Sequence, residues 1–237
     1  MDKIFKANEL FKEALKNLKN RNVSIDINTI HKETYNLMII YKNNYYEKNL
    51  KEYLRNLNLS KDVEEKVLNA LLKPYNDKYS NIIEALSRSL SQSFQPISGK
   101  LAELCAEYEL QKNDLKYKID YEKNKNHTDI IIYYKSNKKI FHRIEVKNVS
   151  LRERATRGLI FDGDSLLGFF NQPNEFTEEN VKILNESCKS TGGYCYVPPE
   201  LFDYLVEIYE DAKIDRFKKN IDFGRDMKYF VENGNLP

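Results

Sequence analysis

The sequence has 237 residues, enough for one large domain or for a core domain with an accessory one. Its 41% hydrophobic and 31% charged residues indicate a soluble protein with a real core, and no stretch approaches the roughly 20 apolar residues of a membrane helix. The N-terminus lacks the apolar segment of a signal peptide, so the expected location is cytoplasmic, and a net charge of +2 excludes a simple polycation.

Residues 1 to about 95 have helical periodicity. Apolar residues recur at helical spacing in four stretches, which are residues 4–18, 31–57, 62–72 and 82–90. Ser60 is a suitable cap for the third stretch, and Pro74 ends it. The many Lys, Asn and Tyr residues of this region could contact a phosphate backbone, or could equally form the solvated faces of helices. We predict a helical N-terminal region over residues 1–95, used for recognition or dimerisation, and a core domain over residues 96–237.

A different pattern begins at the segment Gln95-Pro96-Ile97-Ser98-Gly99. Ser98 or Gly99 can begin a new helix, which we expect over residues 100–110. Runs rich in Ile, Tyr and Val then predict three strands, over residues 115–121, 128–135 and 139–147. A turn at Ser136-Asn137 joins the last two. A strand over residues 194–197 and a helix over residues 200–218 follow, which makes the core domain an α/β structure.

Two acids and a lysine lie on the two neighbouring strands joined by this turn. Glu145 and Lys147 are two residues apart and share a strand face, and antiparallel pairing brings Asp129 of the preceding strand close to Glu145. Hydrolysis of a phosphodiester needs a metal to neutralise the phosphate, an activated water and a cation near the developing charge. Carboxylate oxygens are the ligands that Mg²⁺ prefers. The three residues therefore predict a magnesium-dependent hydrolytic site.

An acid-x-Lys triplet has little weight by itself, because the sequence contains five of them. They begin at Glu64, Asp114, Glu145, Asp211 and Asp226. The triplet at Glu145 differs from the others because it ends a β-run that follows another β-run begun by an acid. The alternative interpretation is an exposed hairpin whose charged residues only face water.

At these residues the sequence resembles the PD-(D/E)XK nuclease superfamily, and especially its type II restriction endonucleases. Thr128-Asp129 and Glu145-Val146-Lys147 carry the resemblance, with Thr128 where the family often has proline. The resemblance covers residues 98–150 and implies a restriction-endonuclease-like α/β core, with a mixed central β-sheet flanked by helices. It also implies a helical glutamate ahead of the hairpin, for which Glu103 is the candidate and Glu107, one turn later, the alternative.

Positive charge is concentrated around the predicted site. Between residues 135 and 157 the sequence has eight Lys and Arg residues against two Glu. Such an excess can neutralise phosphates, which is the main source of DNA affinity. The residues expected to contact DNA are Arg143, Arg152, Arg154, Arg157 and His127. The alternatives are a basic solvated helix for the arginines and a histidine at a strand edge.

Other metal sites have little support in the sequence. The three cysteines and three histidines are dispersed and form no CxxC pair, which argues against a zinc site. The segment Asp162-Gly163-Asp164-Ser165 lacks the rest of a calcium-binding loop and is interpreted as a turn.

These interpretations predict Mg²⁺-dependent, sequence-specific hydrolysis of double-stranded DNA. Asp129 and Glu145 would bind the metal, Glu103 would complete or support its shell, and Lys147 would orient the attacking water and stabilise the developing charge. The resemblance further implies a palindromic target, a homodimer and a cognate DNA methyltransferase as functional partner. Two alternatives stay open: a repair nuclease or junction resolvase with the same core, and a non-catalytic nucleic-acid-binding protein.

Overall fold

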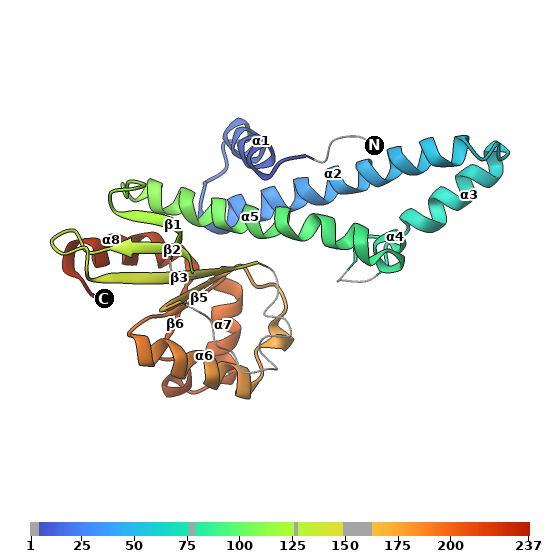
Figure 1. Ribbon diagram of the computed structural model, residues 1–237. Coiled ribbons are helices and arrows are strands. Elements are labelled where there is room, and N and C mark those ends of the chain that lie inside the picture. Colours follow the sequence, from blue (N-terminus) through green and yellow to red (C-terminus); the bar gives the residue numbers. More distant parts are fainter. Residues whose placement is uncertain (1–4, 76–78, 126–127, 149–162) are drawn as a thin grey trace. The chain divides into compact units, whose positions relative to one another are not determined.

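The computed structural model describes residues 5–75, 79–125, 128–148 and 163–237 (Figure 1). Contacts between residues divide the chain into two compact units. The helical unit comprises Met1–Val23 and Lys32–Leu101, and the sheet unit comprises Ser24–His31 and Ala102–Pro237. Within the described residues, no helix is both long enough and apolar enough to cross a membrane.

Five helices contribute to the described part of the helical unit. They are α1 (Ala7–Asn20), α2 (Ile27–Arg55), α3 (Lys61–Leu72), α4 (Ile82–Leu86) and α5 (Arg88–Lys112). The first residues of α2 and the last turns of α5 belong to the sheet unit. The first three stretches predicted as helical coincide with α1, α2 and α3, whereas the fourth, over residues 82–90, is broken at Ser87 and divided between α4 and α5. Ser60 precedes α3 as expected, but its side chain makes no capping hydrogen bond.

The interior of the helical unit combines an apolar core with a buried ion pair. The buried apolar residues include Leu10, Met38, Tyr46, Phe94 and Leu101. Lys42 Nζ of α2 lies 3.0 Å from Glu84 Oε1 of α4, and both side chains are less than 10% exposed. The Tyr46 hydroxyl also donates a hydrogen bond to Glu84. Because an unpaired buried charge is costly, these contacts fix α4 against α2.

The helix predicted over residues 100–110 begins earlier than expected. α5 runs from Arg88 through Pro96 to Lys112, so neither Ser98 nor Gly99 begins a helix. Proline inside a helix removes one backbone hydrogen bond and disfavours the helical conformation of the residue before it. Phe94 and Leu101 are buried on either side of Pro96, and their packing offsets this cost.

The sheet unit is built on a six-stranded sheet whose strands lie in sequence order. The strands are β1 (Tyr121–Lys125), β2 (Thr128–Tyr133), β3 (Phe141–Lys147), β4 (Ser165–Gly168), β5 (Cys195–Val197) and β6 (Phe217–Lys219). β1, β2 and β3 pair antiparallel, whereas β3 to β6 pair parallel. The prediction of a mixed central sheet flanked by helices is confirmed.

Helices cover both faces of this sheet (Figure 1). α6 (Glu178–Thr191) and α7 (Pro199–Ile208) pack on one face, where they bury Cys195 and Val197 of β5. α8 (Phe223–Asn233) packs on the other face, where the ring of Phe223 lies 5.4 Å from that of Tyr196. Successive residues of a strand point to opposite faces, so the three residues of β5 separate the two helical layers.

The strand predicted over residues 115–121 is wrong. Asp114 and Lys118 both have a φ of 66°, which is left-handed backbone that a strand does not contain. The Lys118 N–H donates to the Tyr121 carbonyl at 2.7 Å, so this segment turns and β1 begins only at Tyr121.

The helix predicted over residues 200–218 is wrong in its second half, and β4 was not predicted. α7 ends at Ile208, because the chain then turns to bury Ile214 and Phe217 in the core beneath α6 and to form β6. β4 has four residues, all buried, and so short an apolar run has no periodicity to distinguish it.

Candidate functional site

Antiparallel pairing of β2 with β3 positions the candidate residues. The register places Ile130 opposite Ile144. Continued by one residue, it places Asp129 opposite Glu145, and directly opposite residues of an antiparallel pair share a face. Asp129 Oδ2 also accepts a hydrogen bond of 2.7 Å from the Val146 N–H, which ties the beginning of β2 to the end of β3.

Glu145 and Lys147 form an ion pair near the carboxyl end of β3. Their side chains are 12% and 30% exposed, so both groups are held by the fold and remain partly accessible. Asp129 is likewise half-buried. The structure therefore brings two carboxylates and one ammonium group together on one face of the β2–β3 hairpin, as the sequence predicts.

The helical glutamates belong to the other face of the hairpin. Glu107 of α5 accepts a hydrogen bond from the Tyr121 hydroxyl and pairs with Lys123 Nζ at 2.6 Å. Lys123 lies opposite Ile130 in the register, and Ile130 points away from the face of its neighbour Asp129. α5 thus contacts the face opposite to the one that carries Asp129 and Glu145.

Along the length of the hairpin, Glu103 nevertheless lies near the end that carries Asp129. Gln111 contacts Tyr121 at the beginning of β1, and Glu107 contacts Lys123 two residues further on. One more turn of α5, about 6 Å, brings the half-buried Glu103 level with the end of β1, where Asp129 begins the next strand. Glu103 therefore belongs to that end of the hairpin, but it forms no metal-binding group of three with Asp129 and Glu145.

The donor set at this position suits Mg²⁺. Among the residues that the structure describes, no three carboxylate, imidazole or thiol groups are close enough to hold a metal together. Magnesium is usually bound through one or two carboxylates and keeps several waters, so the pair Asp129 and Glu145 is sufficient without a third ligand. Glu103 is therefore not required for the site to fit the ion.

Of the residues predicted to contact DNA, the structure describes only Arg143. Arg143 forms a two-bond ion pair with Asp164, with Nη2–Oδ1 at 2.7 Å and Nε–Oδ2 at 3.2 Å. A phosphate at Arg143 would have to compete with this carboxylate. The other predicted contacts lie outside the described residues; they are His127, Arg152, Arg154 and Arg157. All four assignments stay predictions.

Two residues next to the site have no counterpart in the sequence prediction. His31 Nε2 lies 2.7 Å from Asn148 Oδ1, and Asn148 directly follows Lys147. The His31 ring also stacks on Phe169 with 4.1 Å between the centroids. Burial lowers the pKa of His31 to about 4, partly offset by the hydrogen bond to Asn148. No sequence pattern links residues 117 positions apart, so only the folded structure could reveal this contact.

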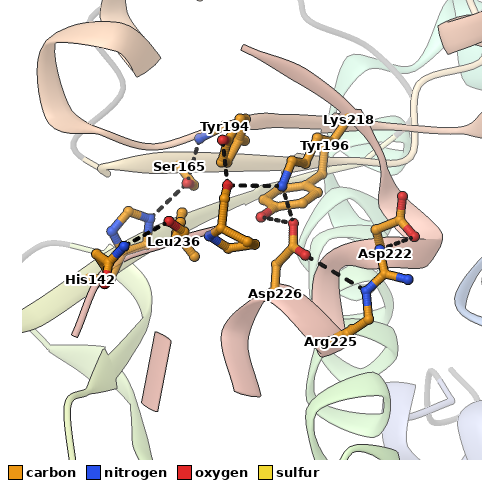
Figure 2. A network of polar contacts seen from close by, with 11 residues as sticks. His142, Ser165, Tyr194, Tyr196, Lys218, Asp222, Arg225, Asp226 and Leu236 are labelled. Atoms are coloured by element: carbon orange, nitrogen blue, oxygen red, sulfur yellow. Dashed lines mark hydrogen bonds and ion pairs between the residues drawn. The ribbon is translucent and has the colours of Figure 1, made fainter. Parts of the chain in front are cut away.

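A polar network ties β3 to its neighbours on the α8 side of the sheet, as Figure 2 shows. His142 Nε2 lies 2.7 Å from the Ser165 hydroxyl, which accepts a hydrogen bond from the Tyr194 N–H. Further along, the buried Asp226 accepts hydrogen bonds from the Tyr196 hydroxyl at 3.0 Å and from Lys218 Nζ at 2.8 Å. The first group of contacts links the beginning of β3 to β4 and β5, and the second links β5 and β6 to α8.

A cavity of about 710 Å³ lies at the other end of β3. Its walls include Phe141, Arg143, Asp164 and Phe230, whereas Asp129, Glu145 and Lys147 do not line it. The candidate site is a surface of the hairpin and not this cavity, which suits a long substrate better than a small molecule.

No family model and no curated protein matches the sequence. Among solved structures, the fold is similar to that of the restriction endonuclease Ecl18kI, in a structure of the metal-depleted enzyme with uncleaved, modified DNA. The TM-score is 0.58 at 14% sequence identity, and the alignment covers 97% of this chain and 79% of that one. This likeness shows that the chain has a restriction-endonuclease-like fold.

Proposed function

We propose that the protein is a Mg²⁺-dependent endonuclease of the type II restriction kind, which hydrolyses phosphodiester bonds of double-stranded DNA at a specific sequence. The observation that carries the proposal is the convergence of Asp129, Glu145 and Lys147 on one face of the β2–β3 hairpin. The fold likeness to an enzyme solved with DNA supports the same substrate class.

Each residue has a role that its position suits. Asp129 and Glu145 would hold the metal, and the hydrogen bond from Val146 orients the Asp129 carboxylate for this purpose. Mg²⁺, when bound, would supply neutralisation of the phosphate oxygens and acidification of a water. Lys147 would orient the attacking water and stabilise the negative charge that develops on the phosphate. Glu103 of α5 would support the metal shell only through water molecules, because it forms no group of three with Asp129 and Glu145.

The proposal extends to partners and assembly. A homodimer would present two copies of the site to a palindromic target, one for each strand. A cognate methyltransferase would protect the host DNA in the cytoplasm. The helical unit would serve recognition or dimerisation.

A cleavage assay on phage or plasmid DNA tests the proposal. The wild-type protein should cleave with Mg²⁺ and stop in EDTA, while its DNA binding persists without the metal. Asp129→Asn, Glu145→Gln and Lys147→Met should each lose on the order of 100-fold in rate or more, because each removes a group that acts on the transition state.

Matched controls separate the site from the general charge of the hairpin. Glu122→Gln on β1 and Lys139→Met before β3 make the same changes of charge away from the site, and should cleave as the wild type does. If the three site variants retain the wild-type rate, the residues are wrongly assigned. If the protein binds DNA but does not cleave it with Mg²⁺ or Mn²⁺, the non-catalytic alternative holds.

A further inference from the structure

The two units of the chain carry opposite net charge. The helical unit contains 17 Lys and Arg residues against 11 Asp and Glu, whereas the sheet unit contains 21 against 25. The unit with the candidate site is thus net negative, which opposes binding of a polyanion. Electrostatic affinity for a phosphate backbone therefore has to come from particular surfaces with an excess of positive charge. The helical unit, with its net positive charge, is where such a surface is expected.

Within the helical unit, α1 presents a row of lysines on one face. Asn8, Lys12, Lys16 and Lys19 are all exposed and follow the helical repeat, opposite to the buried face of Leu10, Ala14 and Leu18. We call these four residues the α1 lysine face. Lys12 and Lys19 are seven residues apart, about 10 Å along the axis, which matches the rise of about three phosphates along one DNA strand.

In the described part of the chain, the lysines of this face are not held in ion pairs. Lys12, Lys16 and Lys19 have no ion-pair partner among the described residues. Of the two acids of α1, Glu13 accepts a hydrogen bond of 2.8 Å from the Tyr41 hydroxyl, whereas the exposed Glu9 lies at the edge of the lysine face and accepts a hydrogen bond from the Lys6 N–H.

A second cationic row in the same unit lacks these properties. Lys48, Lys51 and Arg55 of α2 have similar helical spacing. Lys51 is paired with Glu47, and the exposed Glu52 lies within the row. The α2 row is therefore partly neutralised, which makes it a matched comparison for the α1 lysine face.

We propose that the α1 lysine face binds the phosphate backbone of duplex DNA. The proposal rests on the proposed nuclease function and adds to it the surface that supplies electrostatic affinity. Three lysines without carboxylate partners can each replace a condensed counterion on the DNA, and the released ions make the binding salt-dependent. Contacts of this kind position the duplex without reading its sequence.

The test is the salt dependence of binding by the full chain. The probe is a mixed-sequence duplex of about 30 base pairs, long enough for a specific or non-specific interface, in EDTA so that no cleavage occurs. Affinity is measured between about 50 and 200 mM salt. Over this range, the DNA affinity of a protein with several phosphate contacts falls by about 10³-fold. The variants are Lys12→Gln/Lys16→Gln/Lys19→Gln and, as control, Lys48→Gln/Lys51→Gln/Arg55→Gln.

The α1 variant should reduce the slope of log affinity against log salt by about 2.7, because each lost phosphate contact removes about 0.9. The α2 control should change the slope by less than about 0.9, which is the value for one phosphate contact. Circular dichroism and thermal unfolding verify that both variants fold, since all six substitutions are made on helix surfaces away from the buried core residues.

The outcomes separate this proposal from the nuclease proposal. If the wild type binds the duplex and the two variants have equal slopes, the α1 lysine face has no special role, while the nuclease proposal stands. If the α1 variant loses affinity only for single-stranded DNA or RNA, the choice of duplex DNA is wrong. If the wild type binds no DNA at all, both proposals fail.

Discussion

Burial keeps His31 and His142 neutral in the folded protein. The pKa of each is lowered to about 4, in both cases mainly by burial, and Asp164 partly opposes the shift at His142. A histidine with a lowered folded-state pKa stabilises the fold above its unfolded pKa of about 6.5, and that stability is lost as the pH falls toward 4.

The free energy of unfolding should therefore fall between pH 6.5 and pH 4. Each histidine should contribute roughly 3 kcal/mol to this loss, because one pKa unit corresponds to about 1.4 kcal/mol. Denaturant titrations at several pH values measure it. The variant His31→Gln/His142→Gln should have a flatter profile over this range, and a profile as steep as that of the wild type would contradict the assignment.

His31 should also affect cleavage through Asn148. His31→Phe keeps a ring that can stack on Phe169 but removes the hydrogen bond to the residue after Lys147. We expect about a 10-fold lower kcat with unchanged DNA affinity, because a small displacement of a catalytic group lowers the rate without changing binding. His142→Phe, at the other end of β3, is the control and should keep its rate per folded molecule. Equal effects of both variants on kcat would mean that His31 acts only on stability.

At the residue scale, the sequence predicts contacts between residues that are close along the chain, but not contacts between distant residues. Glu145 and Lys147 could be placed on one face because alternation along a strand is a local rule, and Asp129 joined them through a short hairpin. Their convergence was predictable for that reason. The contact between His31 and Asn148 depends on the packing of α2 against β3 in the sheet unit, for which the sequence has no local pattern.

At the element scale, the connection between α6 and β5 depends on two adjacent glycines with different requirements. Gly192 ends α6 with a φ of +70°, and a Cβ there would meet nothing within 4 Å. A Cβ at Gly193 would lie 1.8 Å from the Asp164 carbonyl oxygen. The first glycine is needed for its backbone conformation and the second for close approach.

Alanine substitutions should distinguish the two requirements. Gly192→Ala should cost about 1 kcal/mol, the strain of a left-handed backbone with a side chain. Gly193→Ala should cost about 3 kcal/mol, because backbone must move away from Asp164, which also holds Arg143 of β3. Chemical denaturation measures both values. If Gly193→Ala costs no more than Gly192→Ala, the close approach is not a constraint.

Element prediction succeeded where periodicity extended over several turns. α1 and α3 have amphipathic patterns, α2 is a long run of recurring apolar residues, and the β2–β3 hairpin has two strands that contain Ile and Val around a turn. The sequence pattern did not predict helix ends correctly where tertiary packing outweighed the local helix propensity. Residues 209–216 contain helix-forming residues, yet burial of Ile214 beneath α6 ends α7 early. Pro96 suggested a boundary that the packing of α5 removes.

At the scale of the whole molecule, one chain carries one candidate site, whereas cutting duplex DNA requires hydrolysis of two strands. The described residues form one hairpin with Asp129, Glu145 and Lys147, so under the proposed function a single chain would act on one strand at a time. Two copies related by a two-fold axis would place one site on each strand of a palindrome. The proposed homodimer is therefore a consequence of the proposed function.

Mixing active and inactive subunits tests this consequence. Wild-type protein and Asp129→Asn are equilibrated together in equal amounts and added to a supercoiled plasmid that contains one target site. A mixed dimer has one competent site, so it should nick one strand and accumulate open circles, while wild-type dimers alone produce linear DNA. The control is wild-type protein at the same concentration mixed with Lys139→Met, which keeps both sites and should produce linear DNA throughout. If Asp129→Asn only dilutes the wild type and no open circles accumulate, the subunits do not share a target. Each chain must then cut both strands in succession.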